Sequence, residues 1–148
     1  MSIQCVLRRV RPWSDDDEGD GTVLELEKAW HGLHYLYTGD VEDGDEPAGF
    51  LVAGGEEVEG DDAGYGPPRV LAPEQVRAWA DFLAGMSDED LRGRYDPERM
   101  TELAVYPEVW QDDDAAGTVA WLLGHAGRLR QFVAEAAAAG EAITVQFE

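Results

Sequence analysis

The chain has 148 residues, of which 11 are basic and 32 acidic, so its formal net charge is −21. The length predicts a single domain over residues 1–148. The only cysteine, Cys5, excludes a disulfide framework and a cysteine-based zinc ribbon. The charge disfavours nucleic acid and anionic membranes, because both are bound through cationic side chains. Without a long apolar run or a recognisable signal peptide, we expect a cytoplasmic protein.

The N-terminal half alternates short apolar segments with acidic loops. Residues 3–10 predict a strand that ends before Pro12, and residues 14–21 predict a polar loop. Residues 28–38 predict a helix that ends at Gly39, since glycine favours helix C-termini. The apolar run 48–53 is typical of a short buried strand.

The C-terminal half is mainly helical. Residues 73–84 carry apolar side chains at helical spacing behind Pro73, and short helices follow after Ser87 and Asp96. The longest helix is expected over 115–139. Inside it, Gly124 and Gly127 flank His125, and we expect something to approach the backbone closely there, because glycine in a helix costs stability.

Both ends of the chain are expected to be strands. Residues 143–148 alternate apolar and polar side chains, as a strand with one buried face does, and residues 3–10 form the other terminal strand. With helices between them, the pattern predicts a single α+β domain. Its small sheet would include both terminal strands and would be packed by about four to five helices.

The helix expected over 28–38 has two different faces. The apolar face is ordinary core, and the polar face carries His31, His34, Tyr35 and Thr38. Buried polar groups need partners, so this face predicts either a hydrogen-bonded network or a cleft. One histidine could also be a general acid or base, because imidazole titrates near neutral pH.

No metal or cofactor is predicted. The histidine spacing allows two metal ligands, but a zinc site needs three or four. The acidic residues over 16–27 resemble the spacing of a calcium loop, yet a strand precedes them where that motif needs a helix. The turn Gly54-Gly55 is followed by acids that would repel phosphate, and no dinucleotide fingerprint is present.

The chain resembles the YfbM-like family of bacterial domains. The resemblance rests on the Trp-His-Gly-Leu-His block at 30–34, the Gly-Tyr-Gly-Pro loop at 64–67, Tyr95-Asp96-Pro97, and Tyr106-Pro107 with Trp110. It covers nearly the whole chain and implies a small cytoplasmic α+β domain without an assigned activity, cofactor or partner. The motif positions that it marks here are Trp30, His31, His34, Thr38, Tyr65, Pro67, Tyr95, Tyr106 and Trp110.

These observations favour a non-enzymatic domain that binds a small molecule or a protein in a cleft at the His31/His34 helix face. The expected ligand contacts are Trp30, His31, His34, Thr38, Tyr65 and Tyr106. A first alternative is a hydrolase or transferase, with His31, His34 and Tyr65 as candidate catalytic residues. A second alternative is an acidic protein that neutralises a basic partner through its loops.

Overall fold

The computed structural model describes residues 3–10, 23–40, 46–57, 67–106 and 115–147. The expected loop over 14–21, the calcium-like spacing that begins in it, Tyr65 and Trp110 lie outside these ranges. The described residues form an α+β domain, as the sequence predicts. Within them, no helix is long and apolar enough to cross a membrane.

Five antiparallel strands make up one sheet in the order β2-β1-β5-β4-β3. The terminal strands are neighbours: β1 (Cys5–Val10) pairs along its whole length with β5 (Ala142–Phe147). The expectation that both ends share the sheet is therefore confirmed. The other three strands are short: β4 (Arg69–Leu71) and the two edge strands, β2 (Val23–Glu25) and β3 (Glu56–Glu57).

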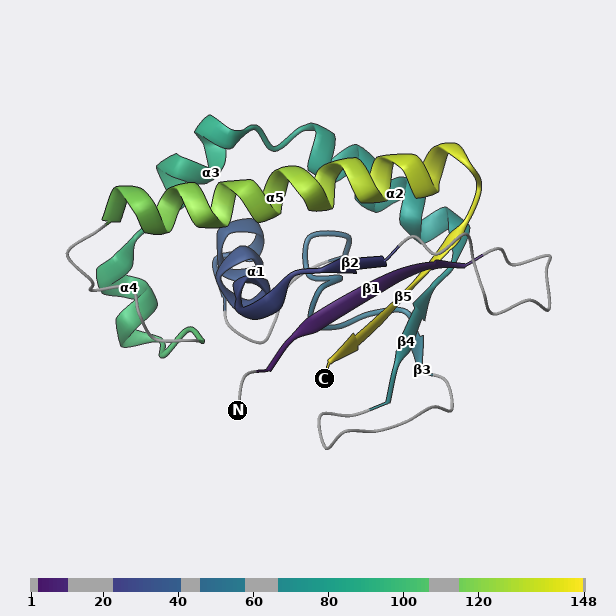
Figure 1. Ribbon diagram of the computed structural model, residues 1–148, viewed down its shortest axis with the longest axis horizontal. Coiled ribbons are helices and arrows are strands. Elements are labelled where there is room, and N and C mark those ends of the chain that lie inside the picture. Colours follow the sequence, from purple (N-terminus) through teal and green to yellow (C-terminus); the bar gives the residue numbers. More distant parts are fainter. Residues whose placement is uncertain (1–2, 11–22, 41–45, 58–66, 107–114, 148) are drawn as a thin grey trace.

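The described residues form five α-helices, of which α2 and α5 pack against strands of the sheet, and α5 runs along most of the molecule (Figure 1). A 3-10 turn, Glu27–Ala29, leads into α1 (Trp30–Thr38), which ends at Gly39 in a left-handed conformation with φ +78°. The other helices are α2 (Pro73–Ala84), α3 (Asp88–Arg94), α4 (Pro97–Glu102) and α5 (Ala115–Ala138).

The segment 48–53 is not the strand that its apolar sequence predicts. It forms consecutive turns, in which the N–H of Phe50 donates to the carbonyl of Pro47 and the N–H of Ala53 donates to that of Gly49. The buried guanidinium of Arg69 donates to two carbonyls of this segment, those of Phe50 and Leu51, and to that of Gly54 directly after it. These bonds satisfy the backbone without a neighbouring strand, which is why the segment can be buried outside the sheet.

Gly124 and Gly127 in α5 also differ from expectation. A Cβ atom built on either residue would meet no atom of the described residues within 4 Å. The close approach that the two glycines predict is thus not made by those parts of the chain. Both positions leave open space beside the long helix.

Candidate functional site

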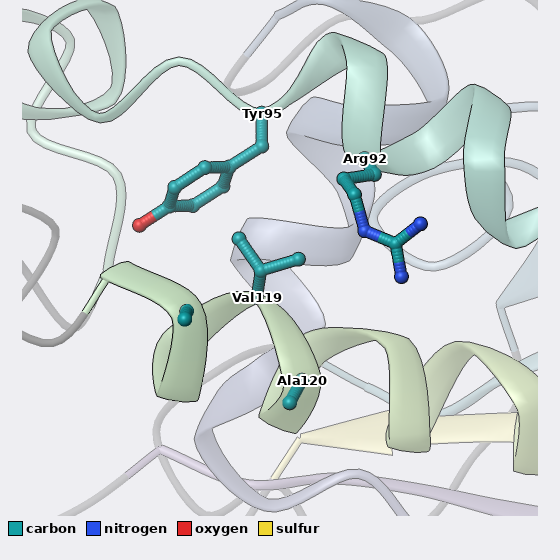
Figure 2. Close-up of a pocket in the computed structure, with 5 residues that line it drawn as sticks. Arg92, Tyr95, Val119 and Ala120 are labelled. Carbon is teal, nitrogen blue, oxygen red and sulfur yellow. The ribbon is translucent and has the colours of Figure 1, made fainter.

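A pocket of about 400 Å³ lies between the α3–α4 corner and the first turns of α5 (Figure 2). One wall carries Arg92 and Tyr95, and the opposite wall carries small apolar side chains of α5. The lining residues of α5 are Ala116, Val119 and Ala120. Their spacing of three and four residues places them on one helix face, and two alanines among them leave room for a ligand.

The local sequence fixes Tyr95 at this corner. Ser87 begins α3 by accepting a hydrogen bond from the N–H of Asp90, and Asp96 begins α4 by accepting one from the N–H of Arg99. Pro97 disfavours a helical conformation at the residue before it, so the two helices cannot merge. Tyr95 therefore sits in extended backbone between them, with φ −68° and ψ 119°.

The two polar side chains give the pocket its chemistry. Burial raises the pKa of Tyr95 above its usual value, so its phenol stays protonated at neutral pH. Arg92 is exposed in the last turn of α3, and its guanidinium makes no hydrogen bond or ion pair with the described residues. The pocket thus combines an apolar lining with one cation at its edge, which suits a small apolar molecule carrying an anionic group.

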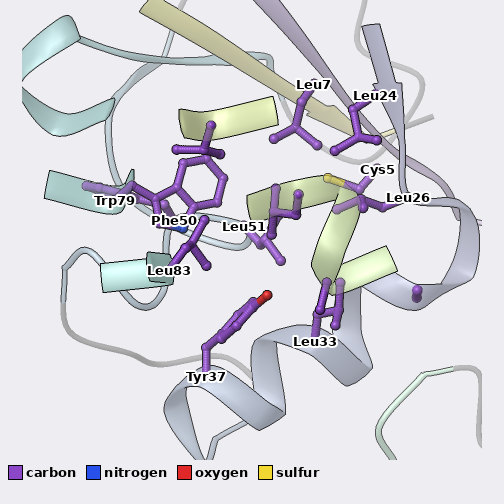
Figure 3. Close-up of a cluster of buried hydrophobic side chains, with 14 of the residues drawn as sticks. Cys5, Leu7, Leu24, Leu26, Leu33, Tyr37, Phe50, Leu51, Trp79 and Leu83 are labelled. Atoms are coloured by element: carbon purple, nitrogen blue, oxygen red, sulfur yellow. The ribbon is translucent and has the colours of Figure 1, made fainter. Parts of the chain in front are cut away.

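Helix α1 packs against both helices that form the pocket, α3 and α5. Its apolar face belongs to the core, where Leu33 and Tyr37 point toward the cluster that contains Phe50 and Trp79 (Figure 3). Burial raises the pKa of Tyr37, so this phenol too is un-ionised. In the same core, burial raises the pKa of Cys5 to about 12, which fits a packing thiol and not a nucleophile.

Three of the predicted ligand contacts converge at the N-terminal end of α1. The Trp30 ring stacks on His31, with centroids 4.9 Å apart, and on Tyr106, with centroids 5.9 Å apart. The His31 Nδ1 accepts a 2.9 Å hydrogen bond from the backbone N–H of Tyr106. Trp30 donates to the carbonyl of Ile3, whose own N–H donates to the Tyr106 hydroxyl. All three side chains are half-buried.

The remaining predicted contacts lie elsewhere. His34 is 0% exposed, so it is part of the interior. Thr38 is at the far end of α1, where its hydroxyl donates to the carbonyl of His34 and accepts from the N–H of Asp40. Thr38 therefore completes the helix terminus. The acidic loops, which would contact a basic partner, fall only in part within the described ranges, for example at 56–57 and 88–90.

The pocket beside Tyr95 was not predicted from the sequence. Tyr95 and its neighbours mark one motif of the family resemblance, but only the fold shows that this corner faces α5. Arg92 has no sequence signal, because an exposed arginine in a helix is ordinary. The small side chains of α5 indicate a pocket only in combination with the opposite wall, which the α3–α4 corner provides.

The fold and the pocket define a single-domain α+β protein with a small-molecule-sized hollow between helices. The family model described as "Domain of unknown function (DUF1877)" matches residues 3–146, so the chain belongs to this family. The crystal structure of YfbM from Escherichia coli, a protein of unknown function, is similar to the whole chain. The TM-score is 0.73 at 20% identity, and 100% of both chains is covered. No curated protein matches the chain.

These comparisons confirm the resemblance to a YfbM-like domain. At 20% identity, the likeness to the Escherichia coli protein concerns the fold alone. The fold does not by itself determine the function, which depends on the side chains of this chain.

Proposed function

We propose that the protein is a non-enzymatic binding domain, and that its cleft is the pocket between Arg92, Tyr95 and the first turns of α5 rather than the His31/His34 face of α1. The observation that carries this proposal is the apolar hollow of about 400 Å³, one of whose lining residues, Arg92, makes no ion pair with the described part of the chain. Pockets that combine an apolar lining with a few polar groups are the usual form of small-molecule sites. The proposal includes a cytoplasmic location, which the free thiol of Cys5 supports.

The ligand is a small molecule with an apolar body and one anionic group. The body would contact Val119 and the Tyr95 ring, and the anion would pair with Arg92. A carboxylate matches the two-pronged geometry of a guanidinium, which binds it through parallel hydrogen bonds.

The histidine face has a positioning role in this proposal. His31 links α1 to the segment after α4 through Tyr106, and the buried His34 lies on the same helix. Because α1 contacts both α3 and α5, this linkage keeps the two walls of the pocket at a fixed separation. Trp30 and Tyr106 contribute through stacking, which favours a rigid arrangement.

Calorimetry with three probes of one shape tests the ligand class. Phenylacetate carries the anion, phenylacetamide is neutral, and phenethylammonium is cationic. We expect phenylacetate to bind about tenfold more tightly than phenylacetamide, since a charged hydrogen-bonded pair contributes at least that factor. The ammonium probe should bind most weakly, because Arg92 repels it.

Two variants locate the binding. Arg92→Gln should reduce the preference for phenylacetate over phenylacetamide, and Val119→Trp should block both probes by filling the hollow. Arg77→Gln is the matched control, because Arg77 is also an exposed helical arginine but does not line the pocket. Equal affinity for all three probes, or unchanged binding in Val119→Trp, would contradict the proposal.

A further inference from the structure

A second hollow of about 420 Å³ lies between strand β2 and helix α5. Its lining residues are Val23, Leu24, Glu25, Glu27 and Arg128. It shares no lining residue with the pocket at Tyr95. Unlike that pocket, it carries charges of both signs, with carboxylates on the β2 side and a guanidinium on α5.

A buried histidine lies next to Glu27, one of the residues that line this hollow. The His125 side chain is 5% exposed, and its Nε2 is 3.8 Å from the Glu27 carboxylate, a separation longer than a hydrogen bond. Neither ring nitrogen makes a hydrogen bond with the described residues. The buried Nδ1 has no partner, and Nε2 lies beside a carboxylate of the hollow without bonding to it, so Nε2 is placed to accept a hydrogen bond from a ligand bound there.

The charges around His125 indicate what that ligand is. Burial lowers the pKa of His125, the nearby Arg128 lowers it further, and Glu27 opposes both, so the ring is neutral at pH 7. A neutral imidazole leaves the Glu27 carboxylate available to a cation. Arg128 itself makes no ion pair with the described residues and is available to an anion. Among the described residues, there is no group of three acidic, histidine or cysteine side chains that could hold a metal ion. We therefore favour an organic cation as the partner of Glu27.

We propose that this hollow binds a small zwitterion through Glu27, Arg128 and His125. The ligand's ammonium donates hydrogen bonds to the Glu27 carboxylate and to the His125 Nε2, and its carboxylate pairs with Arg128. Glu25 on the neighbouring strand adds negative charge on the ammonium side. The site is independent of the proposed function at Tyr95, and either can fail without the other.

The probes are amino carboxylates of increasing length: glycine, β-alanine, 4-aminobutyrate and 6-aminohexanoate. We expect one or more of them to shift the amide NMR signals of residues 25–27 and 125–128. Acetate and ethylammonium each carry only one of the two charges. Each should bind at least about tenfold more weakly than the best amino carboxylate, because one charged pair is lost.

Glu27→Gln and Arg128→Gln should each weaken binding of the best probe about tenfold. Arg92→Gln is the control and should leave this affinity unchanged while altering phenylacetate binding. His125→Phe should also weaken the amino carboxylate, because it removes the nitrogen but keeps a ring of similar shape. The proposal is overturned if no amino carboxylate binds at millimolar concentration, if acetate binds equally well, or if both charge-removing variants bind normally.

Discussion

His31 connects two segments that are 75 residues apart in the sequence, because its Nδ1 accepts the backbone N–H of Tyr106. That bond also fixes the ring: a neutral imidazole that accepts at Nδ1 carries its proton at Nε2. The stacked Trp30 covers one face of the ring. The residue is therefore held as part of a network, which agrees with the positioning role proposed for it.

His31→Gln tests this role. We expect the free energy of unfolding to fall by about 1 kcal/mol, since one hydrogen bond and a ring contact are lost. Affinity for phenylacetate should fall together with the stability, because the lost bond helps to hold α1 between the two walls of the pocket, although His31 itself does not line it. Urea unfolding and calorimetry measure the two quantities, with Lys28→Gln as an exposed control on the same segment. Loss of probe binding at unchanged stability would instead make His31 a ligand contact.

Arg69 explains why the strand predicted over 48–53 is absent from the structure. The run 48–53 has the composition of a buried strand, and Phe50 and Leu51 are indeed buried. What decides its conformation is a side chain more than ten residues further along the chain, whose guanidinium replaces the missing strand neighbour. A local pattern cannot contain such a long-range partner.

Helices were the most predictable elements. The spacing of apolar side chains and the caps at Ser87 and Asp96 are local signals, and the structure has helices that begin at these residues. The helix termini depend on bonds within a few residues, which the sequence displays directly. The pocket could not be predicted in this way, because its two walls come from α3 and α5.

Replacing the two glycines of α5 by alanine should stabilise the helix. Gly124→Ala and Gly127→Ala should each raise the free energy of unfolding by about 0.5–1 kcal/mol, because the added methyl meets open space and stiffens the unfolded chain. Thermal and urea unfolding of the single variants measure this effect.

Gly55→Ala is the control substitution, for which we expect a loss of stability instead of a gain. Gly55 has φ +80°, and a Cβ atom there would lie 2.6 Å from the carbonyl oxygen of Val70. The same substitution should therefore destabilise the protein at this position by more than about 1 kcal/mol. Stabilisation at Gly55, or a loss of stability at both helix positions, would show that these contacts are wrongly assigned.

At the scale of the whole molecule, β5 lies in the middle of the sheet between β1 and β4. Its core face includes Ile143 and Val145, and Val145 is 1% exposed. The alternation of residues 143–147 predicted this face, and both ends of the chain had to meet for a single sheet to form. Folding therefore requires the last strand to pair with the first.

Val145→Asp and Thr144→Asp compare the two faces of this strand. Val145→Asp buries an unpaired carboxylate in the core and should destabilise the fold by about 4 kcal/mol or more, enough to unfold many domains. Thr144→Asp places the same group on the half-exposed face and should cost less than about 1 kcal/mol. Circular dichroism and urea unfolding separate the outcomes, and similar losses at both positions would contradict the register of β5.

The residues that a bound probe contacts show whether the cleft between α3 and α5 is the binding site. We would titrate isotope-labelled protein with phenylacetate and follow the backbone amide NMR signals. The proposed function predicts that the largest shifts fall on residues 92–96 and 116–120, and that Arg92→Gln reduces them. Shifts that are absent at millimolar phenylacetate, or that concentrate away from these two segments, would contradict a binding cleft between α3 and α5.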